Sequence, residues 1–314
     1  MGRMTFVARR LVMLVPVAIG VTIVVFFLIH LIPGDPARTI LGVHATPQRI
    51  ALLHKQWGLN RPLVSQYWLF MDRLAHGNLG QSLFYGTPAR PLILGRLPPT
   101  LWLIVYAAVL AIAISVPLAT IAATRKDAVR DHLVRVVPLL GLGMPPFWVG
   151  ILLIDALAIH VRAFPVSGYG NGFFGHLHAM FLPALTVAIA LAPVVIRALR
   201  ASMLNVLGAE YITTARSKGV PARRLFLRHV LRNAVIPAVT VLGINIGFLI
   251  GGTVIIENIF AVPGIGQLMI NSIFRRDFPV VQGVTLVFGV LVVLVNLLAD
   301  LSYAALDPRV RFDR

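Results

Sequence analysis

The residues best suited to a specific interaction lie in one polar stretch, from Arg197 to Asn233, between two apolar runs. Within this stretch the carboxylate of Glu210 begins a short polar segment that ends at Gly219. Four arginines follow the glycine: Arg223, Arg224, Arg228 and Arg232. A segment of this composition can form a contact with another protein, or it can be a solvated basic turn that lies near anionic lipid.

Sequence motifs for catalysis are absent. A phosphate-binding loop of the form G-x-x-x-x-G-K-[ST] needs a lysine after a glycine, and none of the three lysines, Lys55, Lys126 and Lys218, follows one. Neither H-E-x-x-H nor G-x-S-x-G occurs, and His176 and His178 are wrongly spaced to place two metal ligands on one helical face. The chain has no cysteine. We therefore expect a protein that is not an enzyme and has no catalytic, cofactor or metal site.

The composition indicates a membrane protein. Apolar residues make up 58% of the chain and charged residues 12%, about half the charged share of a soluble domain. Mean hydropathy is +0.87, and a chain this apolar cannot cover its surface with polar groups in water. The net charge of +17 could suit nucleic acid. However, the basic residues cluster at the ends of apolar runs, which is typical of the positive-inside rule.

Six apolar runs are long enough to cross a bilayer, which takes about 20 helical residues. They lie near 9–32, 99–123, 134–160, 179–200, 234–257 and 279–303. We predict an all-α membrane protein with six transmembrane helices. The first helix is expected to be an uncleaved anchor, because no small-x-small cleavage site follows it. Met144-Pro145-Pro146 should break the third.

Basic residues in the short loops fall on the side of the N-terminal arginines, so both termini are expected to be cytoplasmic. We divide the chain into a cytoplasmic N-terminus with the first span (1–32), an external helical subdomain (33–98) and a five-span core (99–314). The core contains the cytoplasmic loop 201–233.

The external subdomain should contain two amphipathic helices. A proline at 47 suits a helix start, with an apolar face over 48–57, and residues 63–75 show a second apolar stripe. Trp57 and Trp68 lie on these faces. They either pack or anchor at the membrane interface, as aromatic residues often do, or form a docking platform for an external solute-binding protein.

Polar residues inside the predicted spans are candidates for a pathway or gate, because burying them in lipid is costly. Asp155 lies deep in the third span with no basic residue nearby in that span, so it either serves a substrate or gating role or pairs with another helix. Asn245 in the fifth span either lines a pathway or, as we favour, bonds a neighbouring helix. Glu257 and Asn258 end that span, where water is expected to reach them, as an external gate or a solvated helix end.

Glu210, Ala215 and Gly219, in this order, resemble the cytoplasmic coupling loop of ABC importer permeases. Nearly the whole chain resembles the dipeptide/oligopeptide/nickel permease family, and its long external segment resembles the B-type subunit, closest in look to that of dipeptide importers. The matching motifs are Ile32–Pro36, Gly58–Pro62, Gly77–Ser82, Met144–Trp148, Glu257–Phe260, Pro263–Gly266 and Ala305–Arg311. Tyr211 replaces an alanine of the loop motif, a substitution that looks usual for peptide permeases.

This resemblance implies a type I importer in the bacterial cytoplasmic (inner) membrane. Its other parts would be a homologous C-type permease subunit, two ATP-binding cassette subunits that bind ATP and Mg²⁺, and an external solute-binding protein. The coupling contact would fall on Glu210, Tyr211, Ala215, Arg216 and Gly219. The loop should form a short helix after Gly208, which ends at Gly219-Val220-Pro221 because glycine ends helices readily and proline cannot continue them.

The expected function is therefore to form half of the translocation pathway for dipeptides or short oligopeptides. A nickel-chelate permease has the same architecture and remains an alternative. An ion-coupled secondary transporter is less favoured, because it usually shows inverted repeats and none is clear here. A signalling or scaffolding membrane protein would not need the coupling loop.

Overall fold

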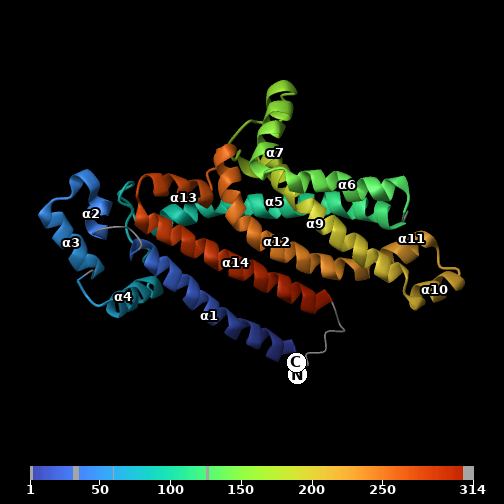
Figure 1. The fold of residues 1–314 in the computed structure, drawn as a ribbon, viewed down its shortest axis with the longest axis horizontal. Coiled ribbons are helices and arrows are strands. Elements are labelled where there is room, and N and C mark those ends of the chain that lie inside the picture. Colours follow the sequence, from blue (N-terminus) through green and yellow to red (C-terminus); the bar gives the residue numbers. More distant parts are fainter. Residues whose placement is uncertain (1–2, 31–34, 59, 125–126, 307–314) are drawn as a thin grey trace. The chain divides into compact units, whose positions relative to one another are not determined.

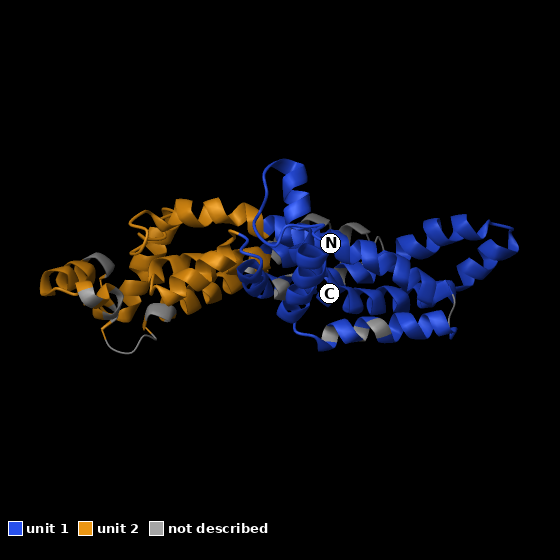
Figure 2. Ribbon diagram, turned by 90° about the horizontal axis from the view of Figure 1, so that it is seen from above, with its two compact units in different colours: residues 1–7, 101–262, 294–314 blue, residues 8–100, 263–293 orange. Residues whose placement is uncertain are grey.

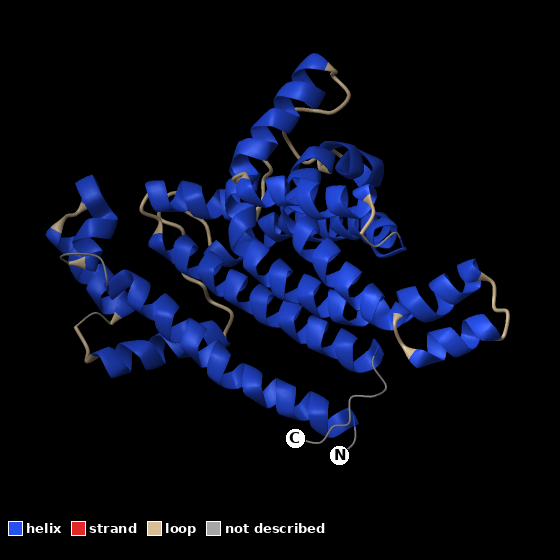
Figure 3. Ribbon diagram, turned by 45° about the vertical axis from the view of Figure 1, so that its right-hand side comes forward, coloured by secondary structure: helices blue, strands red, loops and turns tan. Residues whose placement is uncertain are grey.

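The protein is described from a computed structural model, which covers residues 3–30, 35–58, 60–124 and 127–306. These residues form helices joined by short loops, and the pairing of Gln81 with Pro88 is the one isolated β-bridge among them (Figure 3). The predicted all-α class is confirmed.

Figure 1 labels the helices in chain order. The first part of the chain contains α1 (Arg3–His30), α2 (Pro36–Leu41), the 3-10 helix η1 (Gly42–His44), α3 (Pro47–Trp57), α4 (Leu63–Ala75) and α5 (Ala89–Thr124). The middle contains α6 (Val129–Gly143), α7 (Pro146–Leu153), the π-helix η2 (Ile154–His160), α8 (Gly172–Ala179) and α9 (Phe181–Leu207). The last part contains α10 (Glu210–Ser217), α11 (Ala222–Leu225), the π-helix η3 (Phe226–Leu231), α12 (Arg232–Ile259), α13 (Ile265–Phe274) and α14 (Phe278–Leu306).

Each of the six predicted spans corresponds to helix. Among the described residues, four stretches are long and apolar enough to cross a membrane: Ala89–Thr124, Phe181–Leu207, Ala222–Asn245 and Phe278–Ala299. Residues 9–30 of the first predicted span belong to α1, and its last two residues lie outside the described part of the chain. The third is broken as expected, since α6 ends at Gly143 and α7 begins at Pro146. A proline has no N–H to donate to the preceding turn.

The chain forms two compact units (Figure 2). Unit 1 contains residues 1–7, 101–262 and 294–314, and its centre is α9, in which 67% of the apolar window is buried. In this unit a Cβ added to Gly243 of α12 would lie 2.2 Å from the Cβ of Ala299 in α14. The two helices therefore touch at a point where no side chain larger than hydrogen fits.

Unit 2 contains residues 8–100 and 263–293. Its core is formed by buried apolar side chains from the start of α5, from α13 and from the start of α14: Ala89, Ile93, Ile265, Leu268, Val280 and Val284. The two helices predicted for the external subdomain are present as α3 and α4. Thr46 caps α3 by accepting a bond from the Arg49 amide, at 3.3 Å.

A buried carboxylate fixes the loop before α5 in unit 2. Asp277 is fully buried, and it accepts hydrogen bonds from the Ser82 hydroxyl and from the amides of Leu83 (3.2 Å) and Phe84 (3.4 Å). The guanidinium of Arg275 lies 3.6 Å from the centre of the Phe84 ring. Because these partners are separated by nearly 200 residues, no local sequence pattern indicated the contact.

Candidate functional site

The 201–233 loop contains α10, a helix of two turns with well-defined ends. The backbone of Ala209 is extended before it, and Glu210 is its first residue. The positive end of the helix dipole therefore lies beside the Glu210 carboxylate, an arrangement worth about 0.3–1 kcal/mol.

The end of α10 is set by Gly219, whose φ is +74°. The Gly219 amide bonds the carbonyl of Arg216 at 2.9 Å, and the Val220 amide bonds that of Ala215 at 3.2 Å. This pair of bonds is the Schellman motif, in which a left-handed glycine ends a helix. The predicted short helix and its stop at Gly219 are confirmed.

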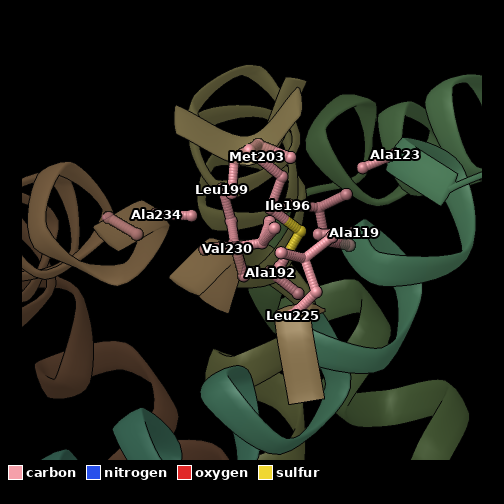
Figure 4. Close-up of a cluster of buried hydrophobic side chains, with 11 residues drawn as sticks. Ala119, Ala123, Ala192, Ile196, Leu199, Met203, Leu225, Val230 and Ala234 are labelled. Atoms are coloured by element: carbon pink, nitrogen blue, oxygen red, sulfur yellow. The ribbon is translucent and has the colours of Figure 1, made fainter. Parts of the chain in front are cut away.

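The inner face of α10 is anchored by Ile212, which is fully buried. It belongs to a buried cluster whose other side chains come from α5, α9, α11, η3 and α12, and Figure 4 labels most of them. The buried members are Ala119, Ala123, Ala192, Ile196, Leu199, Met203, Ile212, Leu225, Val230, Ala234 and Ala238. Ala215 packs against the same cluster. Packed side chains thus join α10 to the helices of the bundle.

A second link joins α10 to α12. The Asn233 side-chain amide donates to the Tyr211 hydroxyl at 3.2 Å and to the backbone carbonyl of His229 at 2.8 Å. Tyr211 itself remains 42% exposed. Its hydroxyl therefore fixes the orientation of α10 while most of the outer face stays accessible.

The outer face of the loop is polar and basic. Exposed residues on it include Thr213, Thr214, Arg216, Ser217, Lys218, Arg223, Arg224 and Arg228. Within the described residues, no group of three or more histidine or acidic side chains could hold a metal ion. The chemistry available on this face is protein or anion binding, through charge and hydrogen bonds.

A buried ion pair lies in the same unit and was not indicated by the sequence. Asp131 of α6 is fully buried and accepts two bonds from Arg200 of α9, both at 2.7 Å. It also accepts from the Asp127 amide at 3.0 Å, and Arg135 lies 3.7 Å away. The hydrogen bonds from Arg200 lower the pKa of Asp131 below its usual value. The sequence shows two acids, Asp127 and Asp131, in a basic loop, but patterning cannot pair either of them with an arginine 69 residues away.

Asp155 lies in the π-helical segment η2 and is exposed. The expectation that no basic residue of that span lies near Asp155 is wrong, because Nδ1 of His160 lies 3.6 Å from Asp155 Oδ1. The depth of Asp155 in the bilayer stays a prediction. The two side chains are five residues apart, the spacing that a π-helix brings onto one face. Asn245 is partly buried and donates to the Val241 carbonyl of its own helix at 2.7 Å, rather than to a neighbouring helix.

Glu257 is fully buried, so the expectation that water reaches it is wrong. The chain turns sharply after α12, where the Val262 amide bonds the Glu257 carbonyl at 2.8 Å, and the side chains of Phe260 and Val262 are buried. Asn258 is exposed, and its amide donates to the Val254 carbonyl at 2.8 Å. The two candidate gate residues therefore differ: one is in the interior and one is on the surface.

The candidate docking residues both belong to the helices of the external segment. Trp68 on α4 is 66% exposed. The side chain of Trp57 lies outside the part that the structure describes, although its backbone ends α3. An exposed tryptophan can anchor at a membrane interface or fill a pocket on a partner protein.

Nearly the whole chain is similar to known transport proteins. Residues 115–312 match the family described as binding-protein-dependent transport system inner membrane component, and residues 3–103 match the N-terminal region of the same kind of component. The glutathione transport system permease protein GsiC of Escherichia coli O6:H1 is 38% identical over 98% of this chain and 99% of its own length. GsiC of Salmonella paratyphi A is 37% identical over the same shares.

Two solved structures share the fold. A chain of the MetNI methionine ABC transporter superposes with a TM-score of 0.58 at 16% identity, covering 69% of this chain and 96% of the other. A chain of an amino acid ABC transporter with histidines gives 0.52 at 16% identity, over 68% and 94%.

Proposed function

Because the chain belongs to the family of binding-protein-dependent transport system inner membrane components, we propose that it forms half of the translocation pathway for short peptides. As a permease of an ABC importer, it is the membrane component of the transporter. The proposed partners are a homologous C-type permease, two ATP-binding cassette subunits that bind ATP and Mg²⁺, and an external solute-binding protein.

The observation that carries this proposal is the packing of α10. Its inner face is anchored through Ile212 and its end is fixed by Gly219, while its polar outer face is free for contact. A cassette subunit that docks on the outer face would move α10 as ATP closes the cassette dimer. The buried cluster around Ile212 would carry this movement into α9 and α12. We propose that the loop lies on the cytoplasmic side together with both termini, and the basic residues of the loop support this orientation.

The proposed substrates are dipeptides and short oligopeptides, with glutathione among them. The relatives named above are permeases of a glutathione transport system, and glutathione is itself a tripeptide. The assembled importer in liposomes, supplied with its binding protein, should take up labelled dipeptides or glutathione only when ATP is present. Collapse of the ion gradients should leave this uptake unchanged.

Uptake of a nickel chelate without competition from any peptide would contradict the substrate assignment and leave the importer assignment standing. Uptake that follows an imposed ion gradient without ATP would contradict both.

The exposed tryptophan on α4 provides a test of the proposed docking platform. Trp68→Ala should reduce the stimulation of ATP hydrolysis by the binding protein, because an exposed aromatic side chain at an interface often contributes about 2 kcal/mol or more. Hydrolysis without the binding protein should persist. Trp57→Ala is a companion variant, and Trp148→Ala on α7, also an exposed tryptophan, is the matched control. Full stimulation of the Trp68 variant would assign this side chain to packing or membrane anchoring.

A further inference from the structure

Unit 2 contains a pocket formed by three helices and a loop. Its walls come from the end of α1, from α4, from residues 78–80 and from the start of α14, and they enclose about 690 Å³ of space, open solvent included. The polar side chains that line it are His30, Gln66, Arg73, Asn78 and Gln282.

The pocket is positively charged. The side chain of Arg73 makes no hydrogen bond or ion pair with any described residue, and burial lowers the pKa of its guanidinium. No aspartate or glutamate is among the lining residues. A guanidinium that is partly removed from water without a carboxylate is costly, so an anion from outside the chain would stabilise it.

His30 adds a polar group to the wall. Its Nδ1 lies 3.1 Å from the Phe26 carbonyl and its Nε2 lies 2.9 Å from Oε1 of Gln66. The amide nitrogen of Gln66 donates to the Arg61 carbonyl at 2.8 Å, which directs Oε1 toward the imidazole. Both ring nitrogens therefore lie within hydrogen-bond distance of an oxygen atom, which fixes the orientation of the imidazole at the wall of the pocket.

The rest of the wall is apolar. It includes Val25 and Phe26 of α1, Phe70 of α4, Leu79, and Leu286 of α14. Because α1 and α14 correspond to predicted spans and the pocket lies at one end of each, its depth is that of the interface between headgroups and acyl chains. The pocket thus combines cationic and apolar walls at this depth.

We propose that this pocket binds the phosphate of a membrane phospholipid, with the start of an acyl chain against the apolar wall. Arg73 is the main phosphate donor, and His30 lies on the same wall as a second polar group. An occupied pocket would hold α1, α4 and α14 together at the membrane surface. The same anionic chemistry is present in the carboxylate of a peptide, but a peptide offers no acyl chain to the apolar wall.

The experiment uses the full assembled importer, delipidated in detergent and titrated with short-chain phosphatidylglycerol under native mass spectrometry. Arg73→Gln should weaken the tightest binding event by about tenfold or more, the usual effect of losing a charge-assisted hydrogen bond. Arg73→Lys should retain most of the affinity, because it keeps the charge. Arg49→Gln is the matched control, since Arg49 is an exposed arginine on α3 of the same unit.

Competition identifies the source of the anion. Inorganic phosphate and a dipeptide, added separately in excess, should fail to displace the lipid. Equal lipid affinity in wild type and Arg73→Gln would overturn the proposal, as would displacement of the lipid by the dipeptide. Circular dichroism and melting of each variant ensure that the proteins compared are folded.

Discussion

Gly219→Asp is expected to abolish solute uptake while the permease still inserts and pairs with its partner subunit. The φ of +74° at this residue suits glycine, so a side chain strains the end of α10 by about 1 kcal/mol. A Cβ at this position meets no other atom of the chain within 4 Å. The fold should therefore tolerate the substitution, and the new carboxylate should obstruct a partner docked on α10. Solute uptake, retention of the partner subunits and ATP hydrolysis, all measured in one reconstituted preparation, test this expectation.

Gly208→Ala is the matched control, because Gly208 precedes α10 with a φ of −84° that any residue can adopt. This variant should transport normally. Glu210→Ala should reduce uptake less than Gly219→Asp, since it removes a favourable helix-end charge without obstructing the surface. Normal uptake by both Gly219→Asp and Glu210→Ala would remove this helix from the mechanism.

Asp131→Ala is expected to lower the stability of unit 1 strongly. It leaves Arg200, which is only 17% exposed, without its bidentate partner. Removing one member of a buried ion pair costs about 3–5 kcal/mol. The melting temperature of the detergent-purified chain should fall accordingly, and Arg200→Ala should have a similar effect.

Arg135→Ala provides the control for this ion pair, because Arg135 is 43% exposed and contacts Asp131 only at 3.7 Å. Its effect should be small. The double variant Asp131→Ala with Arg200→Ala should be less destabilised than the sum of the two single variants. Additive losses, or an effect of Arg135→Ala as large as that of Arg200→Ala, would contradict the assignment.

The ion pair also predicts a pH dependence. Folding lowers the pKa of Asp131, so its contribution to stability is complete above the unfolded value and decreases as pH falls through the lower folded value. Wild type and Asp131→Asn should therefore differ in melting temperature at neutral pH and converge below about pH 4.

Local chemistry made much of the fold predictable. Pro47 and Gly219-Val220-Pro221 act on their own backbone, so the start of α3 and the end of α10 followed from residue types alone. The break before Pro146 has the same origin. Apolar runs of sufficient length likewise located helices in all six predicted spans.

Contacts between distant segments were not predictable in this way. Asp131 with Arg200 and Asp277 with Ser82 join residues whose spacing in the sequence has no regular period. Glu257 was expected to meet water because a helix ended nearby, but the sharp turn after α12 leaves it in the interior. In each case a tertiary contact determined the environment of a charged residue, and single-sequence patterns contain no information about such contacts.

The most direct test of the coupling role is a cross-link from the outer face of α10. The chain contains no cysteine, so Thr213→Cys places one thiol on that exposed face, and Gln48→Cys on α3 is the control. In the assembled importer in sealed vesicles, a bifunctional thiol-to-amine reagent should join residue 213 to a cassette subunit, with a yield that changes when ATP binds. Residue 48 should form no such link. A cassette cross-link from residue 48 and none from residue 213 would contradict the proposed role and orientation of the 201–233 loop.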